Sequence, residues 1–248
     1  MSALLTLDNV TLGYERHPAV HHLSGTVEAG QMLAVVGPNG GGKSTLMRGI
    51  VGSMKPMTGR ILLHGLDRHD IAVLPQGTQI NEDFPISVLE VIAGGLWQSL
   101  GAWKRIDATV RGKIDGALSR VGLVGLEDRQ VGTLSRGQLQ RALFARLLLQ
   151  EARLILLDEP FTAIDPATTQ QLLNLLHDLR RAGATVVAVL HDLDQVRNNF
   201  DTTLLLARHA IAWGPTSAVL GEDNLAAAQN LSQAWDDDAA RCLWDNAA

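Results

Sequence analysis

The chain has little cysteine and few aromatic residues. Cys242 is the one cysteine among 248 residues, and aromatic side chains make up 4% of the sequence. A single cysteine excludes an internal disulfide framework and a zinc site built from several cysteines. Because no oxidised framework is needed, the expected compartment is the cytoplasm.

Long apolar runs and basic blocks are also missing. The longest apolar stretches, such as 154–157 and 204–207, fall far short of the roughly 20 residues that cross a bilayer. The first residues lack the basic start of a signal peptide, and Asp8 ends their apolar stretch early. The net charge is −5, and no segment gathers the positive charge that nucleic-acid binding requires. We therefore expect a globular protein with no nucleic-acid partner.

The most informative stretch is glycine-rich and covers residues 33–45. Four apolar residues at 33–36 predict a buried strand, and the glycines after them predict a tight loop. The spacing Gly37-x4-Gly42-Lys43-Ser44 matches the phosphate-binding loop, in which backbone N–H groups converge on an anion. Lys43 would reach the β- and γ-phosphates and Ser44 would ligate Mg²⁺, at the positive end of a helix that begins near Gly42. A plain glycine-rich turn with a solvated lysine is the competing interpretation.

Polar residues follow three further predicted strands. They are Gln76 after 71–75, Asp158 and Glu159 after 154–157, and His191 after 185–190. Side chains just beyond the carboxyl ends of strands in α/β sheets are the ones that contact ligands. The alternative for Gln76 is a solvated loop amide.

The remaining patterns predict a small sheet and several helices. Alternating residues at 5–7, 10–12 and 20–27 predict an antiparallel sheet ahead of the glycine-rich loop. Between 87 and 149 the apolar spacing is helical, with breaks at 94–95, 101 and 122–125.

Two helix starts and the C-terminal part carry their own signals. Ser135 is expected to cap a long helix, and Asp165 to cap one that begins at Pro166. Short strands are expected at 202–206 and 210–213, before a tail from 221 onward that is helical or partly disordered.

Tyr14 is the one tyrosine of the chain and lies in a loop-like segment, 13–16. Its ring could stack on a purine base, or it could lie half-buried at the end of a strand. Composition alone leaves the two interpretations open.

Together, these motifs resemble the ATP-binding subunit of ABC transporters. The resemblance rests on 37–45, Gln76, the pentapeptide Leu134-Ser135-Arg136-Gly137-Gln138, Asp158-Glu159, Ala163-Ile164-Asp165 and His191. The pentapeptide is the discriminating motif, since other phosphate-loop enzymes lack it. The resemblance implies an α/β fold. This fold would consist of a phosphate-loop ABC-type ATPase core with an N-terminal antiparallel β subdomain. A helical subdomain of about 87–149 would be inserted in the core, making one ATPase domain over 1–220 and a tail over 221–248.

The resemblance implies an ATP hydrolase with Mg²⁺ as its cofactor. Glu159 would be the general base, with His191 and Lys43 as further catalytic residues. The Mg²⁺ of MgATP would be held by Ser44, Gln76 and Asp158. Tyr14 would stack on adenine, which favours the first of its two interpretations. Further nucleotide contacts would come from Gly37, Pro38, Asn39, Gly40, Gly41, Gly42, Lys43, Ser44, Thr45, Gln76, Ser135, Gly137 and Gln138.

The resemblance also implies partners. A second copy would form an ATP-dependent head-to-tail dimer in which Ser135 and Gly137 of one chain close on the ATP of the other, with Asp165 linking the two sites. The dimer would dock on an integral membrane permease, whose coupling helix meets the region of Phe84 and Trp97. A periplasmic or extracellular metal-binding protein would be an indirect partner. The chain would thus lie in the cytoplasm, peripheral on the inner face of the cell membrane.

Two residues depart from the family pattern. Arg136 stands where glycine is usual, while Ser135 and Gly137 are intact. Gly41 stands where alanine or serine is commoner, which is expected to loosen the first helical turn by up to about 1 kcal/mol. Neither departure removes a catalytic group, so we expect an active ATPase.

The segments 83–88, 94–97 and 159–165 resemble most closely the ATPase subunits of zinc and manganese importers. Zinc is the first expectation for the cargo and manganese the second. Importers of an iron chelate, haem or cobalamin are alternatives. A non-transport ABC ATPase of DNA repair or translation would show a coiled-coil insertion, a second cassette or basic arms, which the sequence lacks. A phosphate-loop kinase or GTPase has no use for the pentapeptide.

Overall fold

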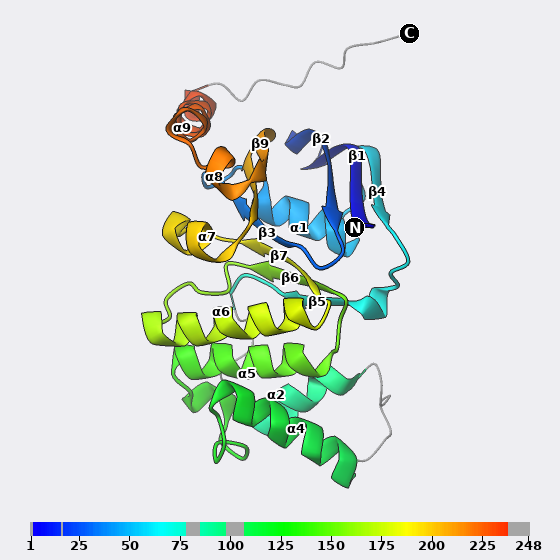
Figure 1. Ribbon diagram of the computed structural model, residues 1–248, viewed down its shortest axis with the longest axis vertical. Coiled ribbons are helices and arrows are strands. Elements are labelled where there is room, and N and C mark those ends of the chain that lie inside the picture. Colours follow the sequence, from blue (N-terminus) through cyan, green and yellow to red (C-terminus); the bar gives the residue numbers. More distant parts are fainter. Residues whose placement is uncertain (1, 16, 78–84, 98–106, 238–248) are drawn as a thin grey trace. The chain divides into compact units, whose positions relative to one another are not determined.

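A computed structural model of the chain describes residues 2–15, 17–77, 85–97 and 107–237, with side chains described as far as residue 231. The chain forms two compact units. We call residues 1–66 with 187–248 the phosphate-loop unit, and residues 67–186 the helical unit. Strand β7 (Thr185–Val189) begins in the helical unit and ends in the phosphate-loop unit (Figure 1).

The phosphate-loop unit contains the expected antiparallel sheet. Its strand order is β2-β1-β4, with β1 (Ala3–Tyr14), β2 (His17–Glu28) and β4 (Thr58–Leu63). The segments at 5–7 and 10–12 lie on one strand, because the register of β1 shifts between Leu7 and Val10, where Asn9 has a φ of 48°. Such a bulge resets the inward–outward alternation without ending the strand.

The same unit also contains the strand that leads into the glycine-rich loop. The order here is β7-β3-β8-β9, with β3 (Met32–Val36) parallel to β8 (Thr202–Ala207), and β8 antiparallel to β9 (His209–Pro215). All five residues of β3 are buried, as expected for a strand covered on both faces. The helices are α1 (Lys43–Val51), α7 (Leu193–Asn199), α8 (Thr216–Val219) and α9 (Glu222–Asp237). Helix α9 packs against β8 and β9.

The helical unit joins a short parallel sheet to the predicted helices. Its strand order is β5-β6-β7, with β5 (Ile71–Leu74) parallel to β6 (Leu154–Asp158). The helices and 3₁₀ turns are η1 (Arg68–Asp70), α2 (Val88–Ala93), η2 (Gly94–Leu96), α4 (Ala108–Val121), η3 (Val131–Thr133), α5 (Arg136–Leu149) and α6 (Pro166–Arg181). Gly101, one of the predicted breaks, lies outside the described residues. The fold class expected from the sequence is confirmed.

Local sequence explains where these helices start. Ser87, Asp107, Ser135 and Asp165 each accept a backbone N–H at the start of α2, α4, α5 and α6. Such caps satisfy N–H groups that have no partner inside the helix. The predicted caps Ser135 and Asp165 are therefore confirmed. Within the described residues, no helix combines the length and the apolar character needed to cross a membrane.

Candidate functional site

The glycine-rich loop connects β3 to α1 and depends on its glycines. Gly37, Gly40 and Gly42 have φ angles of 146°, 73° and 91°, which side-chain-bearing residues rarely adopt. A Cβ on Gly37 would lie 1.9 Å from the carbonyl oxygen of Leu206, so only glycine fits there. Gly42 is the N-cap of α1, which confirms the predicted start of the helix. The loop thus brings its backbone to the positive end of a helix.

Lys43 turns back onto this loop. Its side chain is 6% exposed, and its Nζ donates to the carbonyl oxygens of Gly37 and Pro38 at 2.8 Å each. Ser44 and Thr45 follow in the first turn of α1, half-buried and buried respectively. The loop therefore holds a cation and a hydroxyl next to its own backbone, the groups that a bound phosphate and its metal ion require.

The expectation about Gly41 is wrong. Helix α1 begins at Lys43 with Gly42 as its cap, so Gly41 lies outside the first helical turn and cannot loosen it. Instead, the carbonyl oxygen of Gly41 accepts the N–H of Arg208 at 2.9 Å, and Arg208 in turn accepts the N–H of His21 at 2.7 Å. The turn between β8 and β9 therefore supports the loop from the side.

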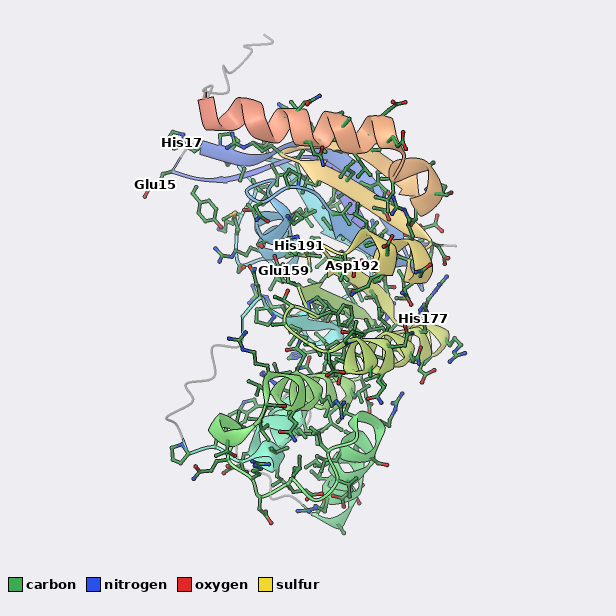
Figure 2. All side chains as sticks on the ribbon, turned by 90° about the vertical axis from the view of Figure 1, so that its left-hand side faces the viewer. Glu15, His17, Glu159, His177, His191 and Asp192 are labelled. Carbon is green, nitrogen blue, oxygen red and sulfur yellow. The ribbon has the colours of Figure 1, made fainter. Side chains whose placement is uncertain are left out.

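Tyr14 belongs to a strand rather than to a loop. It is the last residue of β1 and pairs with His17, which Figure 2 labels beside Glu15 at the hairpin end. Its side chain is 46% exposed, and its hydroxyl accepts a hydrogen bond of 2.7 Å from Arg48 of α1. The ring is thus accessible, while its far end is held by the helix that follows the glycine-rich loop. Arg48 is a residue that sequence reasoning missed, because no motif connects it with Tyr14.

The two carboxylates lie at the carboxyl end of β6 in the helical unit. Asp158 is its last residue and is buried, with 9% of its surface exposed. Glu159 comes next, half-buried, with a φ of 51° (Figure 2). Left-handed backbone is uncommon for a residue with a side chain, and it marks a segment that its surroundings hold in place.

Gln76 and His191 lie beyond the ends of their strands. Gln76 is two residues past β5 in the helical unit, and His191 is two residues past β7 in the phosphate-loop unit. Both side chains are exposed. Asp192, labelled beside His191 in Figure 2, caps α7 by accepting the N–H groups of Asp194 and Gln195.

The pentapeptide forms the start of α5. The Oγ of Ser135 accepts the N–H of Gln138 at 3.2 Å, and the amide oxygen of Gln138 accepts the N–H of Ser135 at 3.0 Å. This capping box fixes the first turn. A Cβ on Gly137 would meet the carboxylate of Asp165 at 3.7 Å, an ordinary contact. The side chain of Arg136 is exposed, so the departure from glycine does not disturb the turn.

Asp165 already has a role within its own chain. Its carboxylate accepts the N–H of Thr168 at 2.8 Å as the cap of α6. This backbone hydrogen bond, with the Thr168 hydroxyl and the charge of Arg141 as smaller causes, lowers the pKa of Asp165 below its ordinary value. The carboxylate therefore stays ionised at neutral pH.

The residues expected from the sequence to bind Mg²⁺ carry the oxygen donors that this ion prefers. Ser44 offers a hydroxyl, Gln76 an amide oxygen and Asp158 a carboxylate, all hard oxygen donors. The described part of the chain contains no group of three or more His, Cys, Asp and Glu side chains placed to hold a metal ion. A sparse oxygen set fits Mg²⁺, which keeps waters and substrate phosphates among its ligands.

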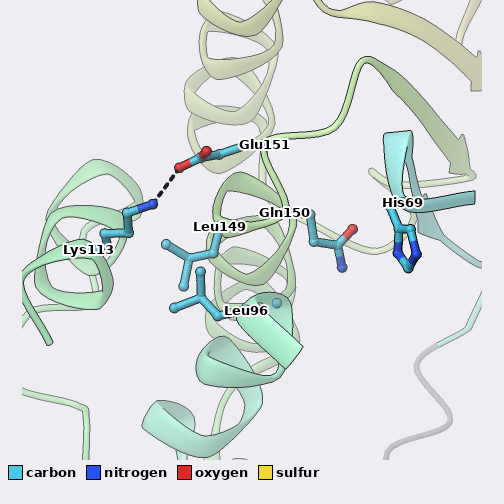
Figure 3. Close-up of a pocket in the computed structure, with 7 residues that line it drawn as sticks. His69, Leu96, Lys113, Leu149, Gln150 and Glu151 are labelled. Atoms are coloured by element: carbon cyan, nitrogen blue, oxygen red, sulfur yellow. Dashed lines mark hydrogen bonds and ion pairs between the residues drawn. The ribbon is translucent and has the colours of Figure 1, made fainter. Parts of the chain in front are cut away.

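A pocket of about 230 Å³ in the helical unit is lined in part by Gly95 and Leu96 of the segment 94–97, but by none of the residues expected to bind nucleotide or metal (Figure 3). Its lining includes His69, Leu96, Leu149 and an ion pair of 2.9 Å between Lys113 and Glu151. Directly after Leu96, the side chain of Trp97 is 64% exposed. Tryptophan is one of the residue types enriched at protein interfaces. Phe84, named with Trp97 from the sequence, lies outside the described residues.

Comparison with protein-family models matches residues 20–162 to the family described as "ABC transporter". Among curated proteins, a probable metal transport system ATP-binding protein of Chlamydia pneumoniae is 39% identical over 224 residues, covering 89% of this chain and 86% of the relative. The manganese transport system ATP-binding protein MntB of Bacillus subtilis is 39% identical over 223 residues, covering 88% and 89%.

The fold comparison agrees with these relatives. A solved chain from an ABC transporter, described as of the metal-chelate type in an inward-facing conformation, superposes with a TM-score of 0.82 and 31% identity. The match covers 92% of this chain and 90% of the solved one. The similarity therefore extends well beyond the glycine-rich loop.

Proposed function

Because the chain belongs to the ABC transporter family and is an ABC-type ATPase of a transporter, we propose that it powers import of a divalent metal ion, with manganese as the favoured cargo. The ATPase part of the proposal rests on the presence in one chain of the Lys43 loop and the capped pentapeptide at the start of α5, and the cargo rests on the metal-transport relatives. The first element binds phosphate, and the second distinguishes transporter-type ATPases from other phosphate-loop enzymes.

Hydrolysis is assigned to the residues after β3 and β6. Phosphoryl transfer to water requires an oriented nucleophile and neutralised charge, with little covalent chemistry. The N–H groups of residues 37–45 and the ammonium of Lys43 neutralise the phosphates. Glu159 accepts a proton from the attacking water. Ser44, Gln76 and Asp158 would hold Mg²⁺, which would supply Lewis-acid charge when bound with ATP.

The remaining site residues orient the nucleotide and the water. Tyr14 stacks its accessible ring on adenine, with Arg48 holding its hydroxyl. His191 contacts the γ-phosphate, while Gln76 senses whether the metal is present. Because the ring and the loop are both anchored on α1, the base and the phosphates are recognised by one rigid element.

A complete site requires two copies of the chain. One copy has one phosphate loop and one pentapeptide, and we propose that Ser135, Gly137 and Gln138 of one copy close on the ATP held by the other. The N-terminal end of α5 favours an anion. Two-fold symmetry then gives two equal sites, and ATP becomes part of the interface. Asp165 links the two sites.

The dimer acts on a membrane permease from the cytoplasmic face. The exposed Trp97 and the adjacent pocket offer the permease an aromatic anchor and a place to insert a side chain. A metal-binding protein outside the membrane would deliver the cargo to the permease. The transported ion therefore touches other subunits and not this chain. The proposed ATPase domain covers 1–220, with 221–248 as an appended tail.

The relatives favour manganese over zinc as the cargo. Relatives from Bacillus subtilis and from Synechocystis are named for manganese transport, at 39% and 37% identity. Zinc, the first expectation from the sequence, becomes the second candidate. The metal-chelate type of the solved neighbour keeps a chelate importer as a further alternative.

The test is the metal content of cells that lack this chain. We expect manganese accumulation to fall in the deletion strain, and to return with the wild-type chain but not with Glu159→Gln. Zinc, iron and manganese are measured together by mass spectrometry. A fall in zinc with manganese unchanged would select the zinc alternative, and unchanged levels of all three would contradict metal import.

A further inference from the structure

Helix α5 makes several contacts with the loop that follows Glu159. The side-chain amide of Gln140 donates to the carbonyl oxygen of Pro160 at 2.7 Å. One turn further along the helix, the ring of Phe144 stacks on that of Phe161, with ring centroids 6.3 Å apart. Residues four apart lie on the same face of a helix, so one face of α5 meets this loop.

The same helix also reaches the far end of the loop. Arg141 donates to the hydroxyl of Thr168 at 2.6 Å, in the first turn of α6. A Cβ added to Gly137 would lie 3.7 Å from the carboxylate of Asp165 and 4.0 Å from the side chain of Ile164. Figure 1 shows α5 and α6 running side by side within the helical unit. The loop from 159 to 165 is therefore flanked at both ends by contacts with one helix, at Pro160 and at Thr168 in the first turn of α6.

The backbone of this loop needs such support. Glu159 and Ala163 have φ angles of 51° and 60°, in the left-handed region that residues with side chains avoid. Glu159 also precedes Pro160, and a residue before proline is restricted toward extended conformations. Strained segments persist only where their surroundings hold them in place.

We propose that Gln140 is a positioning residue for hydrolysis, which holds the Glu159 carboxylate in its working geometry through the carbonyl group of Pro160. This inference rests on the proposed role of Glu159 as general base. Gln140 lies five residues after Ser135, on the helix whose capped end would meet the ATP of the second copy. Closure of that helix end on ATP therefore also fixes the loop that bears the base of its own chain.

The test compares three substitutions at one position. Gln140→Met keeps the length of the side chain but removes the donor. Gln140→Glu places an acceptor against the Pro160 carbonyl, and Gln140→Lys retains a donor that can reach it. We expect Gln140→Met to lower kcat about 10-fold, the scale for losing one hydrogen bond that orders a loop, and Gln140→Glu to lower it further. Gln140→Lys should keep most of the wild-type kcat.

Binding measurements separate positioning from a general loss of structure. The KM for ATP and the affinity for a fluorescent ATP analogue should stay within about twofold of wild type in all three variants. Gln171→Met, an exposed glutamine on α6, is the matched control and should behave as wild type. An unchanged kcat in Gln140→Met, or a loss of ATP affinity equal to the loss of kcat, would overturn the proposal.

Two further comparisons of turnover test the proposal if Gln140→Met does not fold or if Glu159 is not the base. If Gln140→Met fails to fold, the Lys and Glu variants decide the question, since equal turnover by the two would overturn the proposal. Glu159→Gln is assayed alongside. Substantial hydrolysis by that variant refutes the base assignment itself, whereas an inactive Glu159→Gln with a fully active Gln140→Met refutes only the inference about Gln140.

Discussion

The phosphate loop, residues 37–45, and the loop after β6 that bears Glu159, residues 159–165, are built in different ways. We call the second one the carboxylate loop. The phosphate loop takes its shape mainly from its own residues: glycines with positive φ form it, and Lys43 donates to carbonyl groups five and six residues before it, while the turn at Arg208 supports it from the side. The carboxylate loop depends on side chains from elsewhere, with Gln140 reaching Pro160 across 20 residues and Arg141 reaching Thr168 across 27. The proposed phosphate binding thus depends mainly on one short stretch, whereas the proposed placement of the base needs a correctly packed helix.

The largest expected effects separate these two loops by function. Lys43→Ala should weaken ATP binding and hydrolysis together, because the loop loses its cation. Glu159→Gln should retain binding but lower turnover about 10²-fold or more, the scale for losing a positioned general base. Phosphate release and binding of a fluorescent ATP analogue measure the two quantities. Lys55→Ala and Glu222→Gln, both at exposed positions, are the matched controls and should match wild type.

The second effect concerns Tyr14 and its proposed stacking on adenine. Tyr14→Ala should weaken ATP binding by roughly 1–3 kcal/mol, the range for loss of one stacked base. Tyr14→Phe keeps the ring and loses only the hydrogen bond from Arg48, so its cost should be smaller, about 0.5–1.5 kcal/mol. Isothermal titration with ATP measures both. Equal affinity of wild type and Tyr14→Ala would place the base elsewhere.

The smallest effect is a pH dependence of the free energy of unfolding, which arises from the pair His21 and His209. His21 of β2 is buried and stacks on His209 of β9, with ring centroids 4.6 Å apart. Burial, then the charges of His209 and Arg208, with His22 as a smaller cause, lower the pKa of His21. Burial, with the charges of His22 and Arg208, likewise lowers the pKa of His209.

The sign of the effect follows from proton linkage. Below its ordinary pKa of 6.5 the unfolded chain binds more protons than the folded one, so stability is full above that value and falls as the pH drops below it. His21→Gln should flatten this fall by less than about 1 kcal/mol between pH 7.5 and 5.5. Urea unfolding at several pH values measures it, and a variant with the same slope as wild type would contradict the assignment.

Patterns within short stretches predicted much of the fold and the motifs. The start of α1 near Gly42, the caps at Ser135 and Asp165, and the buried strand before Asp158 follow from local chemistry that neighbouring residues determine. The bulge at Asn9, which makes one strand of two predicted segments, was not visible because alternation alone does not report register.

Contacts between distant segments could not be predicted. Nothing in the sequence connects Arg48 with Tyr14, or Gln140 with Pro160, because each pair is joined only by the folded chain. The expectation for Gly41 failed because the exact helix boundary and a contact from a distant turn decide what this residue does. The helix starts two residues later than Gly41, and the glycine instead packs against the turn that contains Arg208.

In the proposed dimer, the phosphate loop of one copy and the α5 start of the other together complete each ATP site. Light scattering of Glu159→Gln tests it most directly, since this variant should trap bound ATP. We predict a dimer at saturating ATP and Mg²⁺, and a monomer without nucleotide or when Ser135→Arg is added to the same chain. A species that stays monomeric while it binds one ATP per chain would contradict the claim.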